Sequence, residues 1–409
     1  MTQERTEPIF YVKVEPAGAT SERVDLSSRV LSFVFEDAER KADKLRLTVD
    51  NWDLSNFDDP IWKKGNILEV SWGYPGHMAP ARQCVIQKVT GFQTLTVEAL
   101  SKAILMHKVA KCRVFENKKR SEVATQIAQE NGYSGFSADI EDSGETLTAI
   151  TQARQTDAQF VKRLAEKEGF EFYIDFDGFH FHKRRLGQRP VRELHWYTAP
   201  EVGEVLSINI ENDVTAKAGA VTLRGRDPLT RKDINAKGSN SETQRESLAS
   251  TIEVVDPETG KTHLEKRNAS EDVRPVAHAS EQGAKREADA RFRRAQHTTV
   301  ELNATVLGDP SLLAKTVVQI SGIGQRLSGK YYVKEARHKI DGSGYTVELK
   351  TMSDGHNQSG GAASKGSPNT ASPKPPSDTS LEPIERVDPE TGATHIQYRD
   401  ARGRGSGGL

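Results

Sequence analysis

Six short runs of alternating apolar and polar residues fill the first 110 positions and constrain the fold more than any other feature. Each run is rich in β-branched or aromatic residues and is bounded by Gly, Pro, Asn or Asp, as strands usually are. The runs are IFYVKVEP, RVLSFVFED, KLRLTVDN, NILEVSWGY, RQCVIQKV and TLTVEALS. They predict a first β-barrel over residues 1–111. WDLSNFDDPIWKKG interrupts the runs as a loop, in which Phe57, Ile61 and Trp62 are the expected core contacts.

The period changes over residues 112–190, which predict a compact α+β module. RSEVATQIAQENG has helical spacing and a closing glycine, and TDAQFVKRLAEKEG predicts a second helix. In the second helix, Thr156 stands as N-cap with Gln159 three residues later, the spacing of a capping box. FEFYIDFDGFHFHKR then alternates on both sides of Asp177 and Gly178, which indicates a tight hairpin.

The second helix carries five candidate structural residues. Phe160 and Leu164 lie one turn apart on its apolar face, and Gly169 ends it. Asp157 stands in the first turn, where the helix dipole favours negative charge. Arg163 lies six residues later, on a different face, and is expected to reach another strand or another subunit.

The second half of the chain repeats the strand pattern in two separated stretches. Together they predict a second β-barrel, and a polar, exposed insertion with a helix at 280–296 lies between them. A Ser-, Gly- and Pro-rich linker follows, and then a tail. The predicted fold class is mainly β with α+β: two barrels flank a small module, with an insertion and a flexible tail. The limits of these later parts are 191–225 with 297–352 for the barrel, 226–296 for the insertion, 353–380 for the linker and 381–409 for the tail.

One segment occurs twice: IEVVDPETGKTH at 252–263 and IERVDPETGATH at 384–395. The Asp-Pro-Glu-Thr-Gly core is turn chemistry between strand formers, so each copy predicts a short hairpin. Either the repeat is a duplicated surface hairpin or both copies dock at equivalent positions of an assembly. In the second case the tail copy provides the turn and contact residues Pro389, Gly392, Ile384, Val387 and Ile396.

Composition narrows the function classes. The 57 Lys and Arg residues balance 58 Asp and Glu residues, which argues against a dedicated, sequence-specific nucleic-acid binder. Two cysteines form no disulfide framework and suit a reducing compartment. We find no signal-peptide pattern and no apolar run long enough for a membrane segment. We therefore expect a soluble chain made in the cytoplasm.

We expect no catalytic, cofactor-binding or metal site. His180 and His182 share a strand face, but no carboxylate stands at a supporting spacing, so a solvated strand end is expected. Asp139 and its acidic neighbours could in principle hydrolyse a sugar bond, but they have the character of an exposed loop. No nucleophile elbow, zincin motif or P-loop occurs.

Three segments carry a family resemblance. FEDAERKADKLRLTVDN with KKGNILEVSWGY, and QARQTDAQFVKRLAEKEGFEFYIDFDGFHF, resemble phage late control gene D proteins. The segment that begins QARQTDAQF is also similar to the hub half of type VI secretion spike proteins. The last segment, from LGDPSLLAK to GYTVELK, resembles that family's final barrel. Its matching residues are Gly329, Tyr331, Val333, His338, Gly344 and Tyr345.

The resemblance implies a non-enzymatic baseplate hub. Three such subunits, each with two tube-type barrels, would form a pseudo-hexameric ring that joins the tail tube to a trimeric spike. The implied partners are two further copies of the chain, the tail tube protein, the spike, other baseplate proteins and the tape measure protein. The alternatives are a tail-associated cell-wall hydrolase and the hub of a type VI or extracellular injection system. His338 is expected to be a packed or interface histidine.

Overall fold

A computed structural model gives the structure of the chain. It describes residues 7–15, 24–176, 178–196, 203–212, 220–226, 231–238, 251–255, 262–266, 271–275, 281–297, 300–324, 327–353, 381–387 and 394–400. Two compact units are separated near residue 360, and each is described by itself.

The first strand block has the predicted strands, all paired antiparallel. Side chains alternate between the core and the outside along each strand, because successive residues of a strand face opposite ways. The hydrogen-bonded order is β3-β4-β8-β7-β5-β1-β2, with β6 beside β5. The bounds are β1 (Ile9–Glu15), β2 (Val24–Asp25), β3 (Val30–Ala38), β4 (Lys44–Asp50), β5 (Ile67–Tyr74), β6 (His77–Met78), β7 (Arg82–Gly91) and β8 (Thr94–Ser101).

Short 3-10 helices lie in the loops of this block. Trp62 is buried and Ile61 packs against the core, as expected. The prediction for Phe57 is wrong, because its side chain is exposed. These helices, with two more in the module, are η1 (Ser27–Arg29), η2 (Ser55–Phe57), η3 (Pro60–Trp62), η4 (Lys102–His107) and η5 (Gly135–Ser137).

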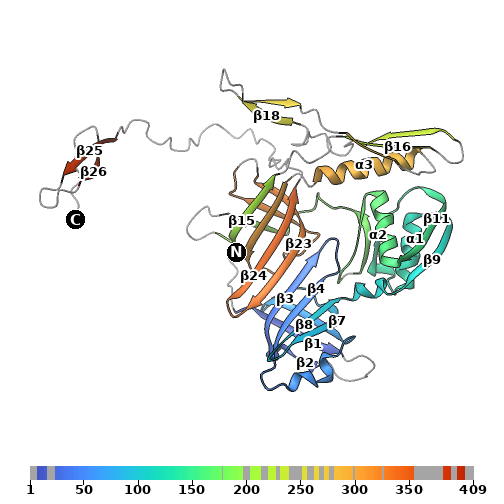
Figure 1. Ribbon diagram of the computed structural model, residues 1–409, viewed down its shortest axis with the longest axis horizontal. Coiled ribbons are helices and arrows are strands. Elements are labelled where there is room, and N and C mark those ends of the chain that lie inside the picture. The colour runs from blue at the N-terminus through green and yellow to red at the C-terminus, as the bar shows by residue number, and fades with distance from the viewer. Residues whose placement is uncertain are drawn as a thin grey trace. The chain divides into compact units, whose positions relative to one another are not determined.

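The second strand block continues the same sheet. β23 pairs with β3, from Glu335 opposite Ala38 to Ile340 opposite Phe33, so one 14-stranded sheet contains both blocks (Figure 1). A single apolar core also fills both blocks. The predicted mainly β fold class is confirmed. The strands are β14 (Arg192–His195), β15 (Val205–Asn212), β21 (Val300–Leu307), β22 (Val317–Ser321), β23 (Gly329–Asp341) and β24 (Gly344–Ser353).

The α+β module has a separate apolar core. β9 pairs with β11, and β13 lies between β12 and β10. Helix α2 has the predicted Thr156 capping box, and it ends at Gly169. Two features require glycine at this position. Its φ of +73° is one that other residues rarely adopt, and a Cβ there would lie only 2.6 Å from the Ala290 Cβ. The bounds are β9 (Ala110–Lys119), α1 (Arg120–Glu130), β10 (Ala138–Ile140), β11 (Thr146–Thr156), α2 (Asp157–Glu168), β12 (Phe170–Ile174) and β13 (Phe179–Lys183).

The expected insertion holds more structure than the sequence indicates. β17 (Asp233–Lys237) and β20 (Glu271–Pro275) lie in it and pair with β16 (Ala220–Arg226). Residues 220–225 of β16 fall in the range predicted for the second barrel, but β16 belongs to this separate three-stranded sheet. The expectation of an exposed stretch is wrong for β17, whose Ile234 and Ala236 are buried in a small core with α3 (Glu281–His297). Helix α3 confirms the predicted helix, and Ser280, the first residue of the predicted range, lies outside the described residues.

Both copies of the repeat form a two-stranded antiparallel hairpin, as predicted. β18 (Thr251–Val255) pairs with β19 (Thr262–Lys266), and β25 (Leu381–Val387) pairs with β26 (Thr394–Asp400). Val255 lies opposite Thr262 and Val387 opposite Thr394, so the register is the same in both. Pro389 and Gly392 lie outside the described residues.

Candidate functional site

The candidates on α2 have packing and ion-pairing roles. Phe160 and Leu164 are buried in the module core. Arg163 donates to the Thr151 carbonyl on β11 at 2.6 Å, so it reaches another strand, as expected. Asp157 is buried and accepts from Lys111 Nζ at 2.6 Å and from Arg113 at 2.8 Å. The helix dipole is therefore the smaller part of what holds this carboxylate.

The candidates in the second strand block pack inside the sheet. His338 is fully buried, 2.8 Å from the Tyr345 hydroxyl and against the ring of Trp72. Burial lowers the pKa of His338 to about 4, so the ring is neutral at physiological pH. Tyr331 is buried and donates to the Leu327 carbonyl at 2.6 Å. Val333 is buried on β23, Gly329 begins that strand, and Gly344, with φ of +119°, begins β24.

Four buried charges, Asp37, Asp43, Arg82 and Lys315, form what we call the junction cluster. Lys315 Nζ lies 2.6 Å from Asp37 and 4.0 Å from Asp43, and Arg82 lies 3.6 Å from Asp37. Arg82 and the two carboxylates come from the first strand block, and Lys315 from the loop before β22. Lys315 Nζ also lies 4.9 Å from the ring centre of Tyr173 on β12. The cluster therefore touches both strand blocks and the module.

The cluster shifts the protonation of its members. Burial, and then the charge of Asp37, raise the pKa of Asp43 to about 7. Burial alone would lower the pKa of Lys315, but Asp37 and Asp43 raise it above its usual value. A charged lysine thus offsets acids that are costly to bury.

A second buried group, centred on Arg184, joins the module to the sheet. Arg184 forms ion pairs with Glu39 at the end of β3 and with Glu171 on β12. Tyr332 on β23 donates to Glu171 at 2.9 Å, and burial raises the pKa of Glu171 to about 7. No sequence motif marks these contacts, because their partners are far apart in the chain.

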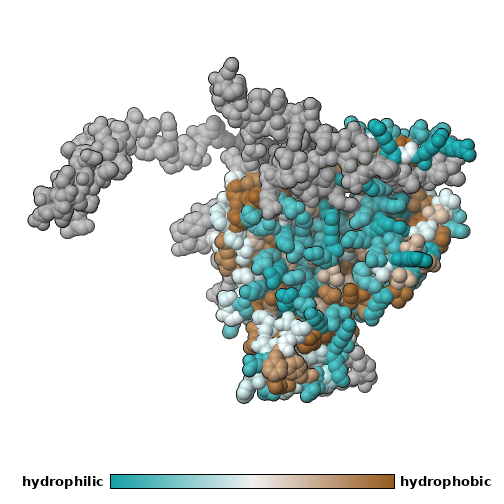
Figure 2. All heavy atoms as spheres, viewed as in Figure 1, coloured by the Kyte–Doolittle hydropathy of each residue, from teal (hydrophilic) through white to brown (hydrophobic). Residues whose placement is uncertain are grey.

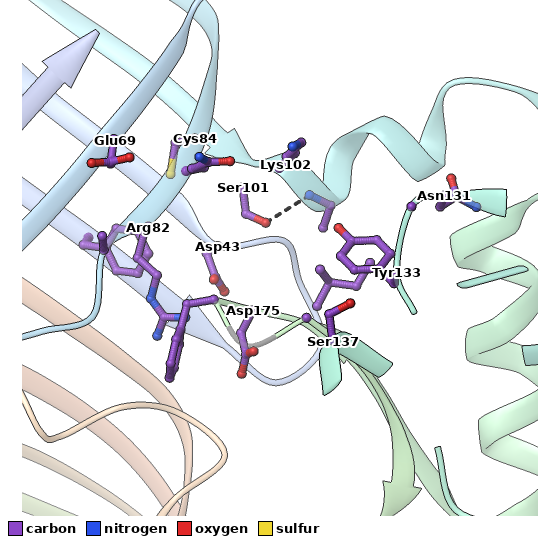
Figure 3. Close-up of a pocket in the computed structure, with 18 residues that line it drawn as sticks. Asp43, Glu69, Arg82, Cys84, Ser101, Lys102, Asn131, Tyr133, Ser137 and Asp175 are labelled. Atoms are coloured by element: carbon purple, nitrogen blue, oxygen red, sulfur yellow. Dashed lines mark hydrogen bonds between the residues drawn. The ribbon is translucent and has the colours of Figure 1, made fainter. Parts of the chain in front are cut away.

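A cavity of about 530 Å³ lies beside the junction cluster, between β7 and the module. Figure 3 shows Asp43, Arg82 and Asp175 around it, with Tyr133 and Ser137 on the module side. Cys84 lines it as well, but burial raises the pKa of this thiol far above the range in which it would be a nucleophile. Three of the charged side chains that line the cavity have partners. Asp43 and Arg82 belong to the junction cluster, and Asp175 binds His180 at 3.0 Å.

The structure overturns the expectation for the two strand histidines. His180 and His182 are buried, because β13 is covered on the face that they share. β10 pairs parallel to β13 and brings Asp139 opposite His180, so a carboxylate does stand beside them. The neighbouring acids are bound by cations: Glu141 by Lys183, Asp142 by Lys119 and Glu145 by Arg286.

Comparisons with known proteins agree with this architecture. A family model described as the Alg8 N-terminal domain matches residues 48–342. The tail protein from Neisseria meningitidis MC58 is similar with a TM-score of 0.61 and 14% identity, over 85% of this chain and 98% of that protein. The 43 kDa tail protein of prophage MuSo2 from Shewanella oneidensis gives 0.60 and 13%, over 85% and 99%.

A third similar structure is a type VI secretion system component from E. coli, described as similar to T4 bacteriophage tail proteins. It gives a TM-score of 0.52 at 10% identity, over 83% of this chain and 76% of that one. At such identities the likeness establishes a shared fold. No helix in the described part of the chain has the length and apolar character of a membrane span.

Proposed function

The chain belongs to the Alg8 N-terminal domain family. From its fold, which it shares with phage tail proteins, we propose that it is a structural hub subunit. It acts in the baseplate of a contractile phage tail or tail-like injection particle. Three copies form a pseudo-hexameric ring that seats a trimeric spike and meets the tail tube. Other baseplate proteins and the tape measure protein are further partners.

The continuous sheet is the observation that carries this proposal. Two strand blocks are fused through β3 and β23 and share one apolar core. Three chains with two fused blocks each would place six blocks in fixed positions. A ring between a sixfold tail tube and a threefold spike needs this arrangement. We also propose that the domains of this hub have the limits predicted from the sequence.

An exposed apolar patch supplies a contact surface. It consists of Trp52, Phe57 and Phe92, at the loop after β4 and the turn between β7 and β8. Trp52 and Phe92 expose 76% and 63% of their surface. The Phe57 and Phe92 rings lie 6.0 Å apart, and Asn51 donates to the Phe92 carbonyl at 2.7 Å, so the loops are tied together. Figure 2 shows hydrophobic surface at the lower end of the view, where the first strands lie. Exposed aromatic groups of this kind are typical of protein interfaces.

We further propose that the chain acts through its surfaces and not as an enzyme. The buried ionisable groups at the junction pair with one another and tie the sheet to the module. This favours the hub over the hydrolase alternative.

The tail copy of the repeat is a further contact surface, and we propose that it docks on a neighbouring component. Deleting residues 381–409 then lowers the yield of complete particles, and an unchanged yield contradicts docking.

Light scattering of the purified chain, alone and with its spike, tests the hub proposal. We expect three copies of the chain in the complex. A chain that stays monomeric at every concentration and never binds the spike would rule the proposal out.

A further inference from the structure

Three side chains from two neighbouring strands of the module converge on one face of its three-stranded sheet. Phe181 is fully buried in the module core, so His180 and His182 on either side of it point together to the other face of β13. The parallel pairing of β10 with β13 places Asp139 beside His180. The His180 and His182 side chains are 11% and 3% exposed, whereas the Asp139 side chain is 38% exposed. The group is thus reachable from solvent on one side.

The separations fit a small coordinated ion. Asp139 Oδ2 lies 3.6 Å from His180 Nδ1 and 3.7 Å from His182 Nε2, and all three atoms lie within 4.8 Å of one another. Nitrogen and oxygen ligands about 2.0–2.1 Å from a tetrahedral zinc ion lie about 3.3 Å apart. The two Asp139 contacts need to shorten by only a few tenths of an ångström to reach this spacing, and the two histidine nitrogens must also move to about 3.3 Å from each other.

The outer nitrogens of both rings are already held. His180 Nε2 lies 3.0 Å from Asp175 Oδ1, and His182 Nδ1 lies 2.7 Å from the Lys183 carbonyl oxygen. Because a carbonyl accepts only, His182 carries its proton on Nδ1 and presents the Nε2 lone pair to the group. The same arrangement at His180 leaves Nδ1 for the group, and that buried atom has no hydrogen-bond partner. Outer carboxylates and carbonyls orient metal-binding histidines in this way.

Two other groups touch the cluster. The Tyr173 hydroxyl lies 3.1 Å from His182 Nε2, and Arg185 lies 2.7 Å from Asp139 Oδ2. A tyrosine hydroxyl is a poorer ligand for such an ion than an imidazole or a carboxylate. The Arg185 side chain is about half exposed and can swing into solvent. Arg185 therefore competes with a cation, and Tyr173 must turn away.

We propose that Asp139, His180 and His182 bind one divalent transition-metal ion, with zinc as the fitting case and water in the fourth position. Two imidazoles and a carboxylate are a donor set that such ions favour over Mg²⁺ or Ca²⁺. The ion fastens the short strand β10 to the hairpin of β12 and β13. This inference does not depend on the hub function.

Cobalt(II) binding to the purified, untagged full chain tests the proposal. We expect one ion per chain, the visible absorption of tetrahedral cobalt, and displacement by zinc. His182→Gln removes a ligand and abolishes saturable binding. Asp175→Asn keeps all three ligands and weakens binding about 10–100-fold through loss of the outer partner. Arg185→Gln removes the competing cation and lowers the dissociation constant.

His77→Gln is the matched control: His77 lies 3.4 Å from Asp309, and within the described part of the chain it belongs to no cluster of three metal-binding side chains. We expect it to bind cobalt like the wild type, and circular dichroism checks that each variant folds. A wild-type spectrum equal to that of the aqueous ion overturns the proposal. Equal binding by the His182→Gln and His77→Gln variants overturns it too.

Discussion

The sheet that contains both strand blocks is filled with apolar side chains, whereas its contact with the α+β module holds buried charges. Phe33, Phe35 and Trp72 are fully buried in the sheet core. At the junction, Lys315 meets Asp37 and Asp43, and Arg184 meets two glutamates. Apolar contact is non-directional, but a buried ion pair is favourable only in one geometry.

This difference indicates a division of roles. The apolar sheet supplies stability and makes the two strand blocks one rigid body. The charges add little net stability, because desolvation opposes their attraction. We infer that they fix the orientation of the module on the sheet. A hub needs both properties, since its neighbours require the module and the blocks in constant positions.

Breaking the junction at its lysine is expected to have the largest effect. Lys315→Met removes the cation closest to the buried Asp37 and leaves only the longer Arg82 contact of this carboxylate in the cluster, so it should lower the free energy of unfolding by about 3–5 kcal/mol. Lys44→Met removes a partly exposed surface pair with Glu98 and is the control, with a loss of at most about 1 kcal/mol. Guanidinium unfolding measures both. Equal losses would contradict the distinction between the junction and an ordinary surface pair.

The pH dependence of stability sharpens the same comparison. Asp43 has a folded pKa of about 7 and a usual value of 3.8, so between these values the folded state holds a proton that the unfolded state has lost. The proton on Asp43 therefore adds on the order of 4 kcal/mol to the free energy of unfolding. This stabilisation is complete below pH 4 and is lost as the pH rises through 7. Asp43→Asn removes this loss, so its stability relative to wild type should increase from pH 4 to pH 8. The exposed control Asp58→Asn should run parallel to wild type. Parallel curves for Asp43→Asn would refute the assignment.

A substitution in the core of the module tests the contribution of apolar packing. Leu164 is 2% exposed in the core around α2, so Leu164→Ala should cost about 2–5 kcal/mol through lost burial and a cavity. Lys162→Ala, on the exposed side of the same helix, should change stability by less than about 0.5 kcal/mol. Urea melts of both variants decide the point. A loss below half a kcal/mol for Leu164→Ala would show that the helix does not pack as described.

The exposed patch should have the smallest effect on stability and a large one on assembly. Replacing Trp52 and Phe92 by Ser removes no core contact, so the free energy of unfolding should change by less than about 1 kcal/mol. Association with other subunits should fall sharply, which gel filtration measures. Val114→Ser alters another exposed apolar residue and should assemble normally. Normal assembly of the patch variant would exclude this surface from the ring contacts.

Local signals in the sequence predicted local structure well. Helix α2 and its cap followed from Thr156, Gln159 and Gly169, since capping needs only neighbours in the chain. The two strand blocks followed from alternation. The sequence could even have marked Asp37 as inward-facing, because it continues the buried alternation of Phe33 and Phe35 on β3.

The partners of the buried polar groups could not be predicted. Lys315 meets Asp37 across most of the chain, and Asp139 meets His180 through a parallel pairing that no turn signal announces. The expectation of solvated histidines failed for this reason. Spacing along one strand shows which residues share a face, but it does not show what covers that face.

Electron microscopy of the purified protein tests the central claim most directly. If two fused strand blocks per chain build a hub, class averages will show closed rings with threefold symmetry and six lobes around a channel. Particles of a single chain, or rings with another symmetry, would contradict the account.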